Sequence, residues 1–188
     1  MTANEFFGSR VAVDPVKWIF GYGSLIWRPD FAYQEQRQAR LPGWRRRFWQ
    51  ASPDHRGVPG APGRVVTLVR DTQAVCHGVA YLPTVDDWPE IITALDIREQ
   101  NGYVLHAVSV SFDDGSTAEA ITYIAGPHNP SFIGPAPLAE MAAQIADAQG
   151  PSGPNREYVL RLAATLDELG IHDEEVHALS SALCEHES

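Results

Sequence analysis

Short apolar segments, separated by turn residues, occupy much of the first half of the chain. Residues 18–20 form an apolar run typical of a buried strand, and residues 40–50 mix aromatic side chains with arginines, whose aliphatic stems can lie along apolar surface. Residues 64–69 and 75–82 are rich in β-branched side chains, which favour strands. Because residues 71–73 lie between these two segments, the pattern predicts that they pair as a hairpin.

A second hairpin is predicted nearer the middle of the chain. Residues 103–112 alternate between two faces, as a half-buried strand does. An Asp-Asp-Gly turn at residues 113–115 connects them to residues 119–125, with which we expect them to pair.

Helical spacing appears in residues 86–100 and again in the last third of the chain. Residues 86–100 end at Asn101-Gly102, a helix stop signal. Residues 137–149 and 155–169 are each followed by a glycine, which commonly marks a helix C-terminus, and a last helix is predicted over 173–184. Strands precede helices, so the predicted fold class is α+β.

Length and composition fit one folded domain. The chain has 188 residues, of which 44% are hydrophobic and 20% are charged. We expect residues 1–17 to be an N-terminal extension and residues 18–188 to form a single domain. No stretch approaches the ~20 apolar residues of a membrane helix, and the first residues lack the apolar core of a signal peptide. Only two cysteines are present, so we expect a cytoplasmic protein without membrane contact.

The charge is uneven along the chain. The net charge is −10, yet residues 28–70 contain nine arginines and only three acidic residues. The overall charge argues against broad nucleic-acid binding, whereas the arginine-rich segment suits a small anionic ligand. Aromatic side chains beside Arg45, Arg46 and Arg47 leave open an alternative in which this segment stacks on RNA bases.

The Tyr-Gly-Ser-Leu segment at residues 22–25 is one candidate for chemistry. A glycine-flanked turn after a buried strand can direct consecutive backbone N–H groups toward an anion. The segment is neither a P-loop nor a dinucleotide-binding fingerprint, and it completes only part of the pattern around a serine nucleophile at Ser24. The alternative is a tight turn in which Ser24 only makes hydrogen bonds.

Glu99 is a second candidate, because it lies at the C-terminal end of the helix predicted over residues 86–100. The negative end of the helix dipole and burial in a cleft would both raise its pKa, as suits a general base. The alternative is an exposed carboxylate paired with Arg98. The Asp-His-Arg-Gly segment at residues 54–57 is interpreted as a structural or substrate-lining loop, since the histidine spacing predicts no metal site.

Taken together, these segments resemble the ChaC family of glutathione-specific γ-glutamylcyclotransferases. The resemblance covers residues 18–183 in order, although Cys76-His77 and Pro53 depart from the family pattern. The motifs that carry it are Trp-Ile-Phe-Gly-Tyr-Gly-Ser-Leu-Ile-Trp at 18–27, Arg-Arg-Phe-Trp-Gln at 46–50, Asp-His-Arg-Gly at 54–57, Pro-Gly-Arg-Val-Val-Thr-Leu at 62–68, Gly-Val-Ala-Tyr at 78–81, Arg98-Glu99 with Gly102-Tyr103, and Gly-Pro-Ser-Gly at 150–153 with Asn155, Glu157 and Tyr158.

The resemblance implies a γ-glutamylcyclotransferase-like mixed β-barrel with surrounding helices and a helical C-terminal part. It implies cleavage of glutathione to 5-oxoproline and Cys-Gly, with Glu99 as the catalytic acid and base and with no metal or other cofactor. Because a guanidinium fork suits a carboxylate, and not because of the resemblance, we expect the glycine carboxylate of glutathione to meet Arg56 or Arg64. The substrate-binding residues so implied are Ile19, Phe20, Gly21, Tyr22, Gly23, Ser24, Leu25, Tyr103 and Arg56.

Two alternatives to this function stay open at the level of sequence. One is a cyclotransferase for other γ-glutamyl peptides or for γ-glutamylamines. The other is a non-catalytic regulatory protein. No nucleic-acid or membrane partner is expected for the glutathione enzyme or for these two alternatives; only the RNA-stacking alternative at Arg45, Arg46 and Arg47 would involve a nucleic acid.

Overall fold

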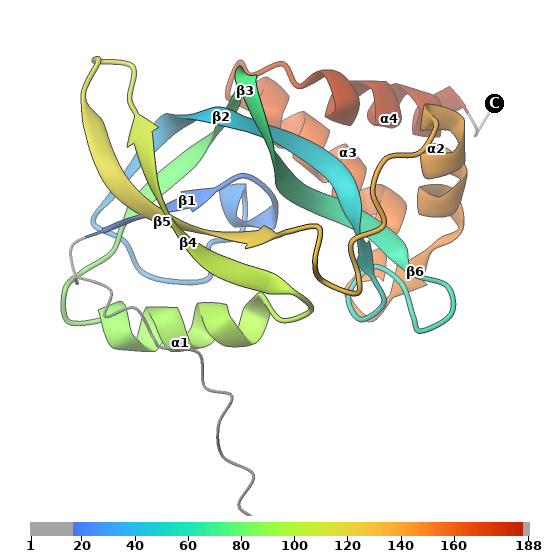
Figure 1. Cartoon of the computed structure of the whole chain (residues 1–188), viewed down its shortest axis with the longest axis horizontal. Coiled ribbons are helices and arrows are strands. Elements are labelled where there is room, and N and C mark those ends of the chain that lie inside the picture. Colours follow the sequence, from blue (N-terminus) through green and yellow to red (C-terminus); the bar gives the residue numbers. More distant parts are fainter. Residues whose placement is uncertain (1–16, 186–188) are drawn as a thin grey trace, which may run out of the picture.

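A closed five-stranded barrel forms the centre of the molecule (Figure 1). The computed structural model describes residues 17–185, so the predicted extension over 1–17 lies outside the described residues except for Lys17. The barrel strands are β1 (Trp18–Gly21), β2 (Glu35–Ser52), β3 (Gly63–Leu82), β4 (Tyr103–Ser111) and β5 (Thr117–Ala125). Neighbours follow the order β1-β3-β2-β4-β5, and β1 closes the barrel by pairing antiparallel with β3 and parallel with β5. The predicted mixed β-barrel is therefore confirmed.

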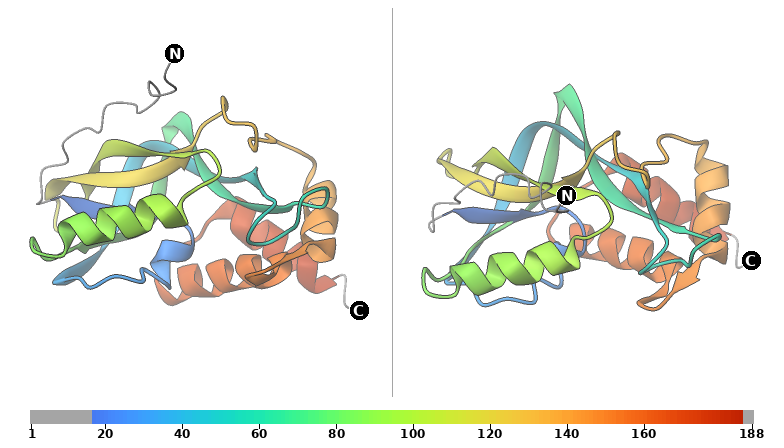
Figure 2. Two further views of the ribbon diagram at one scale, coloured as in Figure 1. Left: turned by 90° about the horizontal axis from the view of Figure 1, so that it is seen from below. Right: turned by 60° about the horizontal axis from the view of Figure 1, so that its bottom comes forward.

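The helices lie on two sides of the barrel. The described residues contain α1 (Trp88–Arg98), α2 (Leu138–Asp147), α3 (Asn155–Glu168) and α4 (Glu174–Glu185). In Figure 1 α1 runs along one side of the barrel, whereas α2, α3 and α4 contact one another beside it; the two views of Figure 2 agree. The α+β class with a helical C-terminal part is confirmed. No helix within residues 17–185 is long and apolar enough to cross a membrane.

The apolar face of α1 fixes the position of the helix end that carries Glu99. Ile91 and Leu95 of α1 are buried against Ile19 of β1 and Ile121 of β5. Burial of each such side chain is worth about 1.5–3 kcal/mol, so the helix is held firmly on the barrel wall.

The hairpin predicted between residues 64–69 and 75–82 is wrong. Both segments belong to the single strand β3, which pairs with β2 from Ser52↔Gly63 to Glu35↔Leu82. Residues 71–73 contain no glycine or asparagine for a tight turn, and a register shift opposite Gly43 absorbs them instead. The long β2–β3 pair thus extends from the barrel to the C-terminal helices.

The turns after β4, α3 and α2 were also predicted, and the first two are confirmed. The β4–β5 hairpin is confirmed, with Ser111 opposite Thr117 and Gly115 at φ 82°. Gly170 follows α3 at φ 69°, as predicted for a helix C-terminus. Gly150 does not end α2, because the chain turns extended at Ala148 and residues 149–154 form the small hairpin of β6 (Gln149–Gly150) and β7 (Gly153–Pro154).

Candidate active site

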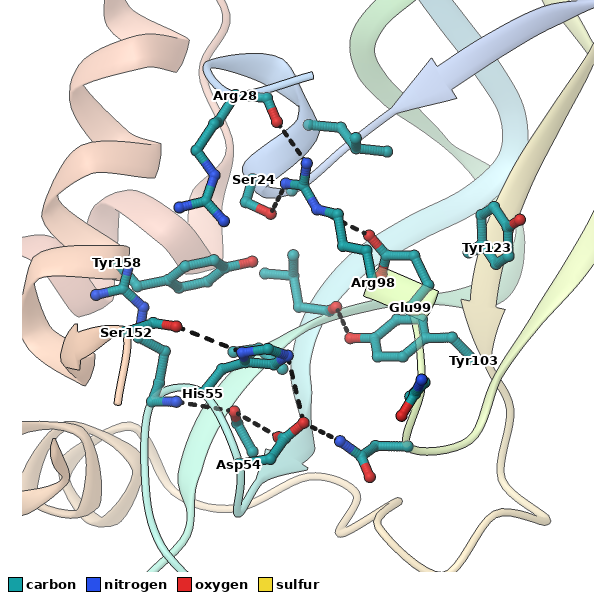
Figure 3. A pocket seen from close by; sticks show the side chains of 18 of the residues that line it. Ser24, Arg28, Asp54, His55, Arg98, Glu99, Tyr103, Tyr123, Ser152 and Tyr158 are labelled. Carbon is teal, nitrogen blue, oxygen red and sulfur yellow. Dashed lines mark hydrogen bonds and ion pairs between the residues drawn. The ribbon is translucent and has the colours of Figure 1, made fainter. Parts of the chain in front are cut away.

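A cavity of about 130 Å³ opens where six separate parts of the chain meet (Figure 3). The parts are the 22–28 segment after β1, the 51–56 segment at the end of β2, residues 65–66 of β3, residues 98–103 at the end of α1, residues 122–123 of β5, and Ser152 with Tyr158 near the start of α3. Motifs that are distant in sequence therefore line one cavity.

The structure brings most, but not all, of the predicted site residues to this cavity. Tyr22, Gly23, Ser24, Leu25, Arg56, Glu99 and Tyr103 line it. Ile19, Phe20 and Gly21 are not among the lining residues. Ile19 and Phe20 are fully buried strand residues, so their contribution is to hold the following loop in place.

Close packing shapes the 22–25 loop, which turns through the 3-10 helix η1 (Ser24–Ile26). A Cβ at Gly23 would lie 2.9 Å from Val66 Cγ2 and 3.0 Å from the Tyr158 hydroxyl, so a larger residue would force the loop away from the barrel. The Tyr22 hydroxyl donates to the carbonyl of Tyr123 (2.7 Å), while the Tyr22 carbonyl accepts from Arg46 Nε (2.7 Å). The loop is thus fixed from both faces.

Glu99 caps the C-terminus of α1 rather than lying in its last turn. Its backbone N–H donates to the Leu95 carbonyl (2.8 Å), and the chain then reverses through Asn101 and Gly102 at positive φ into β4. Its side chain is only 18% exposed and lies 3.5 Å from Arg98 Nε. Burial raises the pKa of the Glu99 carboxyl and Arg98 opposes that rise, so the alternative of a solvent-exposed carboxylate is wrong.

Three buried or part-buried tyrosines, Tyr22, Tyr103 and Tyr158, line the cavity. Burial is the main reason that the pKa values of Tyr22, Tyr103 and Tyr158 are all raised, and the charge of Glu99 acts in the same direction. The Tyr103 hydroxyl donates to the Val66 carbonyl (2.7 Å). The phenols therefore stay neutral near pH 7 and supply polar groups without adding charge beside Glu99.

Arg98 connects the catalytic candidates, and sequence reasoning considered it only as a partner of Glu99. Its guanidinium donates to Ser24 Oγ (2.9 Å), to the Arg28 carbonyl (2.7 Å) and to Asp30 Oδ2 (3.2 Å). One side chain thus joins the end of α1 to the segment after β1. The sequence signals for Arg98 were its place directly before Glu99 and the family motif that contains both residues; its contacts with the loop, about 70 residues away along the chain, left no local signal.

Asp54, His55 and Arg56 line the cavity. The 54–57 segment was interpreted as either a structural or a substrate-lining loop, and this position agrees with the second interpretation. The Arg56 N–H donates to Ser52 Oγ (3.0 Å), and His55 Nδ1 lies 3.4 Å from Ser152 Oγ. A Cβ at Gly150 would lie 2.3 Å from the His55 carbonyl, so this glycine permits close contact between the two loops. Within residues 17–185 no group of side chains could hold a metal ion.

Arg64 does not reach the cavity, so its implied role toward a substrate carboxylate is wrong. Its guanidinium donates to Gln144 Oε1 (2.6 Å), the Phe48 carbonyl (3.0 Å) and the Gly134 carbonyl (3.2 Å) in a buried site. Its position in β3 directs the side chain toward α2, where it joins the barrel to the C-terminal helices.

The arginines at 45–47 also serve the fold. Arg46 is 1% exposed and bonds Asp173 Oδ2 (2.7 Å) and the His77 carbonyl as well as the loop. Arg45 pairs with Asp71 and Arg47 with Glu175. Each of the three guanidinium groups is therefore engaged within the protein.

Proteins that are similar to this chain in sequence or structure include several named as γ-glutamylcyclotransferases. The glutathione-specific γ-glutamylcyclotransferase 1 of Homo sapiens is 42% identical over 85% of this chain and 74% of its own. The γ-glutamylcyclotransferase 2-3 of Arabidopsis thaliana is 41% identical over 87% of this chain and 86% of its own. A crystal structure of a yeast γ-glutamylcyclotransferase specific to glutathione superimposes with a TM-score of 0.85 at 31% identity, covering 91% of this chain and 96% of that one. The model of the family described as ChaC-like protein matches residues 17–186, and the chain belongs to that family.

Proposed function

We propose that this protein is a glutathione-specific γ-glutamylcyclotransferase that acts in the cytoplasm and requires no cofactor. The observation that carries the proposal is that the buried Glu99 carboxylate and the 22–25 loop line the same cavity. The names of the relatives support glutathione as the substrate.

The reaction is an intramolecular aminolysis. The α-amine of the glutamyl unit attacks the carbonyl carbon of its own γ-amide, a new C–N bond closes a five-membered ring, and the old C–N bond breaks. The products are 5-oxoproline and Cys-Gly, whose amine receives a proton. No water is consumed, so the site needs a folded substrate and a proton carrier rather than a hydrolytic nucleophile.

Glu99 is the proton carrier. At neutral pH the substrate amine is protonated. Glu99 removes that proton before attack and delivers it to the leaving nitrogen, and a second proton, lost by the ring nitrogen as the new amide forms, passes through Glu99 to the amine of Cys-Gly. The raised pKa of Glu99 brings its proton affinity closer to what both transfers require. Such acid–base assistance is worth about 10²–10⁴-fold in rate.

The 22–25 loop holds the glutamyl unit. The first N–H groups of η1, those of Ser24 and Leu25, have no partner within the helix and can donate to a carboxylate or to the developing oxyanion. Ser24 is a positioning residue rather than a nucleophile, because its hydroxyl accepts from the cationic Arg98 (2.9 Å). Tyr103 lines the same part of the cavity and helps to exclude water.

Substrate comparison tests this function. The purified protein is assayed for 5-oxoproline with glutathione, γ-Glu-Ala and γ-glutamyl-lysine at equal concentration. We expect kcat/KM to be highest for glutathione. A higher kcat/KM for γ-Glu-Ala or γ-glutamyl-lysine would mean that the substrate is another γ-glutamyl compound and not glutathione. If the folded protein turned over none of the three compounds, a regulatory role would be favoured.

A further inference from the structure

The shape of glutathione places a second requirement on the cavity. Its glycine carboxylate lies two residues beyond the scissile γ-carbonyl, or about 7 Å away in an extended conformation. If the γ-carbonyl lies beside Glu99, the carboxylate must reach the other side of the cavity. A cation on that side would therefore distinguish the tripeptide from shorter or uncharged γ-glutamyl compounds.

Arg28 and Arg56 both line the cavity and come from two different segments. In Figure 3, Arg28 and Tyr158 lie on one side of the cavity, and Glu99 and Tyr103 lie on the other. The Arg56 guanidinium carbon lies 5.7 Å from the centre of the Tyr158 ring, which places it on the same side as Arg28. The two guanidinium groups thus lie across the cavity from the proposed base.

Both groups retain donors that can bind a carboxylate. Arg28 pairs through Nε with Asp30 (3.0 Å), and its two terminal nitrogens make no hydrogen bond within the described part of the chain. Asp30 is shared with Arg98 (3.2 Å), so it only partly balances Arg28. Arg56 uses Nη1 for the Pro154 carbonyl (3.1 Å), and its acidic neighbour Glu157 is 3.9 Å away and largely exposed.

Arg28 and Arg56 bring two positive charges to the same side of the cavity. Burial is the main cause that lowers the pKa of Arg56; Glu157 and Tyr158 oppose it, and the charge of Arg28 reinforces it. A bound anion would relieve that repulsion, and a planar guanidinium can bind a carboxylate through two parallel hydrogen bonds.

Other basic side chains are less suitable. Arg98 is committed to Ser24 and to the backbone of Arg28, and Arg64 is buried under α2. His55 lies between Asp54 (3.3 Å) and Ser152 (3.4 Å) at the rim.

We propose that Arg28 and Arg56 together bind the glycine carboxylate of glutathione and so select the tripeptide over uncharged analogues. The inference rests on the proposed function and adds to it the residues that determine specificity. Arg98 contributes indirectly, since its bond to the Arg28 carbonyl fixes the backbone from which Arg28 extends.

The test compares glutathione with its glycine amide, which has the same shape but lacks the terminal charge. We expect the unmodified protein to favour glutathione by about 10- to 100-fold in kcat/KM, as a charged hydrogen-bonded pair permits. Arg28→Gln and Arg56→Gln should each lower this ratio toward one. Arg56→Lys retains the charge and serves as the second variant if Arg56→Gln does not fold.

Arg161→Gln is the matched control, because Arg161 is an exposed arginine of α3 that influences Arg56 but does not line this cavity. In this variant, the ratio of kcat/KM for glutathione to kcat/KM for its glycine amide should equal that of the unmodified protein. Turnover of glutathione with a ratio near one, or an unchanged ratio in Arg28→Gln and Arg56→Gln, would overturn the carboxylate site and leave the proposed function intact. No turnover of glutathione by the folded protein would overturn both.

Discussion

The two sides of the cavity differ in charge and in how their side chains are held. The Glu99 side chain is 18% exposed and lies among neutral tyrosines that bond backbone carbonyls. On the other side, the Arg28 side chain is 58% exposed and shares Asp30 with Arg98, while the Arg56 side chain is only 12% exposed. The Glu99 side thus offers a buried carboxylate, and the other side offers two guanidinium groups, one of them open to solvent.

We expect this difference to separate the chemical step from substrate recognition. A proton transfer benefits from a buried carboxylate, because burial moves the pKa toward neutrality and removes competing water. Recognition of a charged substrate benefits from guanidinium groups that line the cavity, because their charge attracts the substrate from solution. Variants on the two sides should therefore affect different kinetic parameters.

The largest effect is expected on the buried side. Glu99→Gln removes the proton carrier and keeps the size of the side chain, so kcat should fall by about 10²–10⁴-fold while KM changes little. Circular dichroism should show an unchanged fold. A kcat within a factor of about two of the unmodified value, far smaller than that loss, would remove Glu99 from its assigned role.

An intermediate effect is expected at Arg98, which joins the two sides. Arg98→Met breaks the charged hydrogen bonds to Ser24 and to the Arg28 carbonyl, and kcat/KM should fall by about 10- to 100-fold. Because Arg98 lowers the pKa of Glu99, its loss raises that pKa, and the acidic limb of the kcat/KM profile should move to higher pH.

Arg98→Lys is the control for charge, and its acidic limb should lie between those of Arg98→Met and the unmodified protein. An acidic limb that stays at the same pH in Arg98→Met would show that Arg98 acts only on the shape of the loop.

The smallest effect is expected at Ser24. Ser24→Ala removes one hydrogen bond from Arg98, whose bonds to Arg28 and Asp30 remain, so kcat/KM should fall by about tenfold or less. Mass spectrometry of the unmodified protein during turnover should detect no acyl group on Ser24. A trapped acyl-serine would show that Ser24 is a nucleophile and matters more to the reaction than this ranking assumes.

The sequence predicted those parts of the fold that local signals determine. The β4–β5 hairpin follows from alternation and from a turn ending in Gly115, and α1 follows from its apolar spacing. Local signals failed at residues 71–73, because a long partner strand extends past them and keeps them in β3. The pairing on both sides of this segment is a tertiary property, and the only local signal was that residues 71–73 contain no glycine or asparagine.

The site was predictable by residue type but not by contact. Glu99 and the 22–25 loop were identifiable, because their family motifs and their positions next to a helix end and a buried strand are local features. The burial of Arg46 and Arg64 was not, since arginines in a strand are also typical of a solvated face. The contacts of Arg98 depend on how α1 packs against the barrel.

The most direct test of the central claim is turnover of reduced glutathione in ¹⁸O-labelled water, followed by mass spectrometry. Attack by the substrate's own amine consumes no water, so the account predicts unlabelled 5-oxoproline and Cys-Gly, both strongly reduced in Glu99→Gln. Labelled glutamate as the first product, or unlabelled 5-oxoproline formed equally by Glu99→Gln, would contradict it.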